Sequence, residues 1–255
     1  MKLYSWNVNG FRAVCQKPEW AWFKASDADI VALQETKAAP GQIPDEHRSP
    51  AGYNSYWLAS TVKKGYSGVA VFSRPAPIQV AEELPYALWQ GEGRLLHLEF
   101  PEFHFFNVYF PNGQKDEQRL NYKLGYYDAF LEFAESCRKS KPIVVCGDFN
   151  TAHRPIDLAR PKENEDTSGF LPIEREWLDK FIAHGYVDTF RLVHGDRPDQ
   201  YSWWSFRMRA RERNVGWRID YFFVSSELRE KVKNAWIEPE IGGSDHCPIG
   251  LELDI

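Results

Sequence analysis

Short apolar runs rich in β-branched and aromatic residues recur along the whole chain, and most of them end in a polar side chain. These runs are predicted to be β-strands and span Leu3–Val8, Ile30–Gln34, Ser55–Ala59, Gly68–Ser73, Leu95–Phe100, His104–Tyr109, Ile143–Gly147, Ile219–Val224 and Pro248–Leu253. Helical spacing of apolar residues predicts helices over Glu19–Ser26, Asp116–Lys139 and Ile173–His184. Strands and helices mixed along one chain favour an α/β sandwich, with sheets inside and helices outside. Several consecutive strands leave no room for a helix between them, so we expect mixed or antiparallel sheets.

Length and aromatic content indicate a large core. No Gly/Ser/Pro-rich linker divides the 255 residues, so we expect one domain over residues 1–255. Aromatic residues make up 15% of the chain, with Trp 10 among them. Such a surplus either fills a core or provides stacking platforms for bases or sugars. We expect most of these rings to lie in the core.

The cysteines and the amino-terminal segment bear on the compartment. Cys15, Cys137, Cys146 and Cys247 are scattered and form no C-x-x-C pair, which indicates free buried thiols in a reducing compartment rather than zinc or disulfides. The start "MKLYSWNV" has a strand pattern instead of the basic and apolar regions of a signal peptide. No run approaches the length of a membrane span. We therefore expect a cytoplasmic protein that does not act at a membrane.

Net charge constrains the partner only weakly. The formal charge of −5 counts against a binder that holds nucleic acid by electrostatics alone. An acidic metal site can lower the total, however, while a local basic strip does the binding.

Polar side chains gather at the ends of the predicted strands. They are acids, amides and an imidazole: Asn7, Asn9, Glu35, Asn112, Asp148, Asn150, Asp220, Asp245 and His246. If the later strands run antiparallel to the earlier ones, all of these groups meet at one edge of the sheets. A polar network that merely ties strand ends together is the alternative to a functional site. One acid at a strand end is a common turn former, but this number of termini is harder to explain in that way.

Several carboxylates in one place predict a bound cation. Each carboxylate raises the pKa of its neighbours, and a divalent cation supplies the missing positive charge. Oxygen and amide ligands without cysteine favour Mg²⁺ or Mn²⁺ over zinc. A magnesium site typically uses one or two carboxylates, so the remaining acids have other tasks, such as activating water. The pattern therefore predicts metal-assisted phosphoester hydrolysis.

Six blocks of sequence resemble a known family. "SWNVNGFRA", "LQETK", "NVYFPNG", "GDFNTAH", "NVGWRIDYFFVS" and "GSDHCPIGLEL" occur in the order seen in exonuclease III and the abasic-site (AP) endonucleases of the endonuclease/exonuclease/phosphatase superfamily. The blocks span residues 5 to 253. "AHRPIDLARPKENEDTSGFLPIERE" and "WWSFRMRARERNVGWR" resemble the DNA-repair branch rather than lipid phosphatases or DNase I-like enzymes.

The resemblance implies an α/β (α+β) fold in the form of a four-layer αββα sandwich, in which two mixed β-sheets pack face to face between helices. It implies cleavage of the DNA backbone on the 5′ side of an abasic site, which leaves a 3′-hydroxyl and a 5′-deoxyribose phosphate. It also implies 3′-phosphodiesterase and 3′→5′ exonuclease activities. The implied partner is double-stranded DNA with abasic sites or 3′-blocked ends, bound by a monomer.

The resemblance also assigns roles at the site. Residues implied to lie at the Mg²⁺ or Mn²⁺ ion are Asn7, Asn9, Glu35, Asp148, Asn150, Asp245 and His246, with Glu35 as principal ligand. Asp148 orients or deprotonates the attacking water, and Asn150 helps to position it. His246 contacts the scissile phosphate, and Asp220 fixes its tautomer. Tyr109 and Asn112 bind the phosphate. Asn9 departs from the branch that has aspartate at this position.

DNA contacts follow from the same resemblance. An abasic sugar offers no base edge, so it is flipped into an apolar slot, for which Trp203, Trp217 and Ile219 match; Trp204 is expected in the core. Backbone contacts are implied for Arg12, Lys37, Tyr66 and the arginines of "FRMRARERNVGWR". If that segment is extended, residues 207, 209, 211 and 213 share one side. Arg207, Met208 and, from the opposite side, Gln114 are candidates for insertion into the duplex.

Two other functions stay open. One is a phosphatase or phosphodiesterase of the same superfamily that acts on inositol phosphates or lipids. Trp203, Trp217 and the arginines count against it. The other is a non-catalytic DNA-binding module, which would have lost an acid or the histidine from the cluster, and none is lost here.

Overall fold

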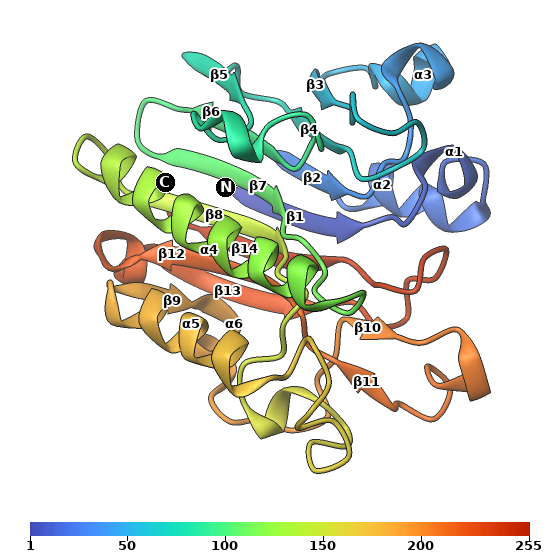
Figure 1. Cartoon of the computed structure of the whole chain (residues 1–255). Coiled ribbons are helices and arrows are strands. Elements are labelled where there is room, and N and C mark those ends of the chain that lie inside the picture. The colour runs from blue at the N-terminus through green and yellow to red at the C-terminus, as the bar shows by residue number, and fades with distance from the viewer.

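Two six-stranded sheets form the centre of the computed structural model, which describes residues 1–255 (Figure 1). Sheet A contains β1 (Lys2–Asn7), β2 (Ile30–Gln34), β3 (Asn54–Leu58), β4 (Val69–Ser73), β13 (Val232–Ile237) and β14 (Ile249–Leu253), in the order β13-β14-β1-β2-β4-β3. Sheet B contains β5 (Gln79–Glu82), β6 (Leu95–Glu99), β7 (His104–Tyr109), β8 (Ile143–Asp148), β9 (Tyr186–Asp188) and β12 (Asp220–Ser225), in the order β5-β6-β7-β8-β12-β9. Both sheets combine parallel and antiparallel pairs.

Helices cover the outer faces of the two sheets. The α-helices are α1 (Phe11–Val14), α2 (Ala21–Ala25), α3 (Asp45–Arg48), α4 (Glu117–Arg138), α5 (Pro172–Ala183) and α6 (Thr189–His194). Short 3-10 helices span Pro18–Trp20, Pro40–Gln42, Ala87–Trp89, Pro155–Asp157, Arg207–Arg209 and Ser226–Lys231. A two-stranded ribbon, β10 (Trp203–Trp204) with β11 (Gly216–Trp217), lies beyond one end of the sheets (Figure 1).

Three apolar layers hold this stack together. Between the sheets, Leu3 and Ile30 of sheet A share one cluster with Phe105, Val144 and Phe222 of sheet B. A second cluster joins sheet B to α4 and α5, and a third joins sheet A to α1 and α2. The predicted four-layer αββα sandwich is therefore confirmed.

Element boundaries agree with the sequence pattern where an apolar run is strong. The predicted strands Ile30–Gln34 and His104–Tyr109 have the observed bounds, and the long helix α4 starts after Asp116, whose carboxylate accepts a hydrogen bond from the Arg119 amide at 2.8 Å. The strands β5, β9 and β13 were not predicted. β5 and β13 lie at sheet edges, where exposed polar residues interrupt the apolar pattern, and β9 has only 3 residues.

The strand register brings the predicted polar termini to one edge. Asp148 at the end of β8 pairs with Tyr109 of the parallel strand β7 on one side and with Asp220 of the antiparallel strand β12 on the other. In sheet A, Asn7 pairs with Gln34, which directly precedes Glu35. The expectation that later strands run antiparallel to earlier ones is confirmed for β12 and also for β14.

Two smaller expectations concern the cysteines and a possible membrane span. Cys15, Cys137, Cys146 and Cys247 are free thiols, and all but Cys137 are buried. None of the helices combines the length and apolar character that a membrane crossing requires.

A buried ionic network fixes the approach to β12. Arg218 donates from Nε to Asp157 Oδ1 at 2.8 Å and from Nη2 to Asp188 Oδ2 at 2.7 Å. Arg191 also donates to Asp157 Oδ1, at 2.5 Å. Burial by itself would raise the pKa of the Asp157 carboxyl, but Arg218 and Arg191 outweigh it and lower this pKa to about 2. The network joins three segments that are distant in sequence: the turn at Asp157, the β9–α6 junction with Asp188 and Arg191, and Arg218 before β12.

We predict that Asp157→Asn flattens the acid dependence of stability. An aspartate in the unfolded chain has a pKa of about 3.9, so the unfolded state binds more protons than the native state between roughly pH 4 and 2. The stabilisation by Asp157 is therefore present above pH 4 and is lost as the pH falls toward 2. Urea unfolding at several pH values measures this slope. Parallel curves for the wild type and the variant would contradict the prediction.

Candidate active site

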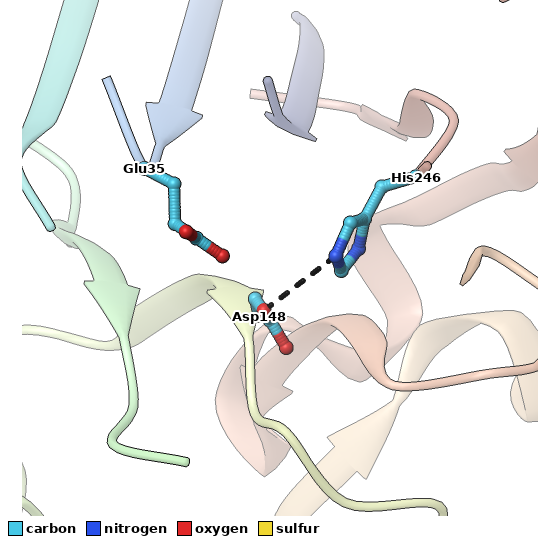
Figure 2. Close-up of side chains that lie close together, drawn as sticks. All are labelled: Glu35, Asp148 and His246. Carbon is cyan, nitrogen blue, oxygen red and sulfur yellow. Dashed lines mark ion pairs between the residues drawn. The ribbon is translucent and has the colours of Figure 1, made fainter. Parts of the chain in front are cut away.

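Three side chains from separate strand ends converge at the edge of the sheets. Glu35 follows β2, Asp148 ends β8, and His246 lies in the loop before β14. Figure 2 shows all three pointing toward a common space. One potential ligand atom from each lies within 4.8 Å of the others, and His246 Nε2 is 3.9 Å from Asp148 Oδ2. Residues that are far apart in the chain thus form one cluster.

His246 is held by a carboxylate on its far side. Its Nδ1 lies 2.8 Å from Asp220 Oδ2, which also accepts from the Ser202 hydroxyl at 2.6 Å. Burial by itself would lower the pKa of His246, but Asp220, Asp148 and Asp245 outweigh it and raise this pKa well above the ordinary value. The ring is therefore a cation at neutral pH. With Nδ1–H donating to Asp220, Nε2–H faces Asp148.

Asp148 is buried among other acids. Its Oδ1 accepts from the backbone N–H of Asn150 at 2.7 Å, and its Oδ2 accepts from Asn7 Nδ2 at 2.9 Å. Burial raises the pKa of Asp148, and the Asp220 and Glu35 carboxylates raise it further, whereas His246 lowers it. The site thus holds more negative charge than its own cations compensate.

Glu35 sits between an amide and an ammonium group. Its Oε1 accepts from Asn7 Nδ2 at 2.9 Å, and its Oε2 lies 2.8 Å from Lys37 Nζ. Lys37 also donates to Asn9 Oδ1. Lys37, predicted to contact DNA, is here a direct neighbour of the carboxylate cluster.

Asn9 and Asp245 are bonded to each other rather than to the group of three. Asn9 Nδ2 donates to Asp245 Oδ1 at 2.8 Å, and Trp203 Nε1 donates to Asp245 Oδ2 at 3.1 Å. Both oxygens of Asp245 are therefore occupied. Through this carboxylate, Trp203 is connected to the acidic edge.

The donor set fits a hard divalent cation. The Glu35 and Asp148 carboxylates lie close enough to share one ion, and no cysteine lies beside them. The protonated His246 ring next to them has no free nitrogen lone pair and is not a ligand. A cation would also relieve the repulsion among Glu35, Asp148 and Asp220. Glu35 and Asp148 are the residues that would hold it.

Tyr109, Asn112 and Asn150 line the next part of the site. Asn112 Nδ2 donates to Asn150 Oδ1 at 3.1 Å, and Asn150 Nδ2 donates to the Phe110 carbonyl at 2.9 Å. Burial and Glu35 raise the pKa of the Tyr109 phenol, so it stays protonated and can donate a hydrogen bond.

Sequence reasoning missed two residues that support these side chains. Arg94, a buried cation, donates to the Tyr109 carbonyl at 3.0 Å, and its Cζ lies 4.7 Å from the centre of the Tyr109 ring. Ser202 holds Asp220, as described above. Arg94 begins the apolar run "RLLHLEF", and a charge next to such a run is the signal that could have identified it.

A cavity of about 970 Å³ opens beside the cluster. Among the predicted site residues, those lining it are Glu35, Tyr109, Asn112, Gln114, Asp148, Asn150, Trp203, Arg207, Met208, Trp217, Ile219, Asp245 and His246. The rings of Trp203 and Trp217 meet edge to face, with centroids 6.2 Å apart, and Ile219 and Phe170 pack in the same small apolar cluster. The cavity therefore has an acidic end and an apolar wall.

The other predicted residues lie outside this lining. Asn7 and Asp220 are buried behind it. Arg12 and Lys37 line a neighbouring hollow, and Tyr66 lines another. Tyr66 accepts hydrogen bonds from Arg94 at 2.6 Å and from Arg119 at 2.8 Å.

The prediction that residues 207, 209, 211 and 213 share one side of an extended segment is wrong. Residues 207–209 form a 3-10 turn in which Met208 has a φ of 57°. Arg211 points inward, donates to the carbonyls of Ser244 and Ile241 and stacks on the buried Trp204. Arg218 belongs to the ionic network. Of this set, Arg207 and Arg213 line the cavity.

The chain is similar in sequence and in fold to known proteins. Residues 4–246 match the model of the Endonuclease/Exonuclease/phosphatase family. An exodeoxyribonuclease of Bacillus subtilis is 45% identical over 100% of both chains. The DNA repair nuclease APEX1 of Danio rerio is 39% identical over 100% of this chain and 83% of that protein. The structure of a 3′ phosphatase from Neisseria bound to a product DNA hairpin superposes with a TM-score of 0.91 at 28% identity and covers 100% of both chains.

We predict that Glu35→Gln weakens Mn²⁺ binding at least about tenfold, because the amide loses one of the charges that a divalent cation requires. Counting free Mn²⁺ by electron paramagnetic resonance measures the affinity. Glu99→Gln, which changes a glutamate on sheet B outside the cluster, is the matched control and should bind as the wild type does. Equal affinity for Glu35→Gln and the wild type would place the ion elsewhere.

Proposed function

The chain belongs to the endonuclease/exonuclease/phosphatase family and is a nuclease of the DNA-repair type, and we propose that it hydrolyses the DNA backbone on the 5′ side of abasic sites with Mg²⁺ or Mn²⁺. The products are a 3′-hydroxyl and a 5′-deoxyribose phosphate. We extend the proposal to 3′-phosphodiesterase and 3′→5′ exonuclease activities, because a blocked or ordinary 3′ end presents the same phosphodiester to the same groups.

One observation carries the proposal. The cluster of Glu35, Asp148 and His246 opens directly into the cavity whose apolar wall contains Trp203 and Trp217. Hydrolytic groups and a slot for a sugar without its base are thus next to each other. A phosphatase for soluble inositol phosphates has no need of this apolar wall.

The protein's own groups suffice to direct the proton transfers. Asp148 accepts a proton from the water that attacks phosphorus, and its raised pKa suits a general base. Asn150, fixed by Asn112 and by the Phe110 carbonyl, positions that water. As the new P–O bond forms, the bond to the 3′-oxygen breaks, and this oxygen takes up a proton from solvent and leaves as the 3′-hydroxyl.

Charge that develops on the phosphate oxygens meets fixed donors. The His246 cation presents Nε2–H, and Tyr109 presents its phenol. Asp220 keeps the His246 ring in the required tautomer. A bound divalent cation would neutralise further charge on the same phosphate.

Recognition of the lesion rests on the apolar slot and on the DNA backbone. In this proposal a flipped sugar without a base enters the slot formed by Trp203, Trp217 and Ile219, whose apolar walls offer no hydrogen-bond partner to a base. Arg12, Lys37 and Tyr66 lie in hollows outside the cavity, where a duplex backbone would pass. Gln114, Arg207 and Met208 lie at the cavity and are positioned to enter the duplex.

The direct experiment uses a duplex that contains one tetrahydrofuran abasic analogue. Incubation with Mg²⁺ should cut the strand 5′ to the analogue, and EDTA should prevent the cut. Intact strands in Mg²⁺, or turnover of a soluble phosphoinositide without cleavage of DNA, would overturn the proposal. Binding without hydrolysis under any divalent ion would instead indicate a DNA-binding module.

We predict that Asp148→Asn and His246→Ala each lower the rate of incision on the order of 10²-fold or more, because each removes a group that acts in the transition state. Single-turnover cleavage of the same duplex measures the rate. Asp128→Asn, on the outer helix α4, and His184→Ala, at the residue that directly follows α5, are the controls and should cut at the wild-type rate. Incision near the wild-type rate by either site variant would remove that residue from the mechanism.

We predict that Trp217→Ala lowers the preference for abasic over intact DNA by about tenfold or more, because the slot loses one of its apolar walls. Competition between abasic and intact duplexes measures the preference. Trp89→Ala, which removes a tryptophan that packs on α4, is the matched control. An unchanged preference would show that discrimination lies elsewhere.

A further inference from the structure

A fully buried ion pair lies behind the candidate site. Lys123 of α4 and Glu174 in the first turn of α5 have no exposed surface, and Lys123 Nζ is 2.5 Å from Glu174 Oε1. Neither residue lines the cavity or belongs to the acidic cluster. Replacing a buried ion pair by apolar residues of similar size is often neutral for stability. The attraction between Lys123 and Glu174 therefore does not by itself explain why the pair is present. The segments that the two side chains hold in place are the more informative feature.

Lys123 holds the chain that follows Asp148. Besides Glu174, its ammonium group donates to the Asn150 carbonyl at 2.8 Å and to Thr151 Oγ1 at 2.7 Å. Asn150 has a φ of 52°, a left-handed conformation that is costly for most side chains but accessible to asparagine. The ammonium thus fixes the backbone of the residue that is proposed to position the attacking water.

Glu174 holds the wall of the cavity. Its Oε2 accepts from the amides of Gly169 at 2.6 Å and Leu171 at 3.1 Å, and its Oε1 also accepts from the Ser168 hydroxyl at 2.9 Å. Every acceptor on the carboxylate is directed at Lys123 or at residues 168–171. The segment that lines the cavity is therefore bonded to the same ion pair as Asn150.

The segment that Lys123 holds, residues 150–152, contacts the segment that Glu174 holds, residues 168–171, and the second segment also contacts the slot. A Cβ atom on Gly169, whose φ is 101°, would lie 3.2 Å from the Trp217 ring and 3.3 Å from the Asn150 carbonyl oxygen. The Gly169 carbonyl accepts from the Ala152 amide at 2.8 Å. Any shift of one segment is thus passed to the other.

We propose that Lys123 and Glu174 are positioning residues that set the distance between Asn150, which positions the attacking water, and the Gly169–Trp217 wall, where the abasic sugar rests. The inference depends on the proposed function for its chemistry. The ion pair joins the two halves of the site: Lys123 acts on the chemical step through Asn150, and Glu174 acts on the slot through Gly169. Misplacement by about 1 Å can cost on the order of 10²-fold in rate, so such a support affects catalysis without contact with substrate.

The test uses the double variant Lys123→Met/Glu174→Gln, which removes both charges and keeps the side-chain lengths. We expect its single-turnover incision rate at saturating tetrahydrofuran duplex to fall at least about tenfold. Its Kd for that duplex in EDTA should stay within about threefold of the wild-type value. Amide hydrogen exchange should accelerate at residues 149–152 and 168–171. A folded variant that cuts at the wild-type rate would overturn the proposal.

The matched control is Lys141→Met/Glu99→Gln, which removes a second Lys–Glu pair, 2.6 Å apart, at the opposite end of β8. It should change neither the incision rate nor exchange in the two segments. An equal loss of rate in this control would mean that general destabilisation, and not positioning, explains the effect. That result would also overturn the proposal.

Two further arms cover failure to fold and failure of the proposed function. If the double variant does not fold, Thr151→Val removes one acceptor of Lys123 and leaves the buried Lys123 charge paired with Glu174. A reduced rate at unchanged Kd supports the proposal, and an unchanged rate contradicts it. If the wild type leaves the abasic duplex intact in Mg²⁺, the proposed function fails. Hydrogen exchange still decides whether the pair fixes the two segments.

Discussion

Repulsion among buried carboxylates is the constraint on which this site depends. Asp148 and Asp220 are register partners on β8 and β12, and Glu35 approaches them from the other sheet. The negative charges of Asp220 and Glu35 make Asp148 harder to ionise. His246 lies 2.8 Å from Asp220 and 3.9 Å from Asp148, so one imidazolium serves two acids. The remaining deficit of positive charge is what makes a divalent cation and an anionic phosphate fit together here.

Buried charges elsewhere in the molecule are compensated by lysine or arginine. Arg218 pairs with Asp157 and Asp188, and Lys123 pairs with Glu174. No lysine or arginine forms an ion pair with Asp148 or Asp220. A carboxylate cluster that the scaffold leaves under-compensated is a mark of function rather than of stability. The polar network expected as the alternative does exist, and it serves as the support of the cluster.

Much of the fold and of the acidic edge was predictable from local patterns. The run "IVVCGDFN" contains both the buried strand and the acid that ends it, so Asp148 could be placed at a strand end without knowledge of the partners. Edge strands such as β13 were not predictable, because one exposed side chain after another removes the apolar alternation. The arginines after Trp204 were mispredicted because their directions depend on a turn at Met208, which no periodicity indicates.

By itself, the sequence determined which chemical groups stand at the ends of which strands, because alternation and apolar runs are local properties of the chain. Only the tertiary structure decided which of these groups meet. It bonded Asp245 to Asn9 and Trp203, and it turned Arg211 into the protein. It also placed Lys123 where its ammonium group donates to the Asn150 carbonyl and to Glu174. Such contacts join residues that are distant in sequence, and they depend on how two sheets and their helices pack, which a local pattern does not contain.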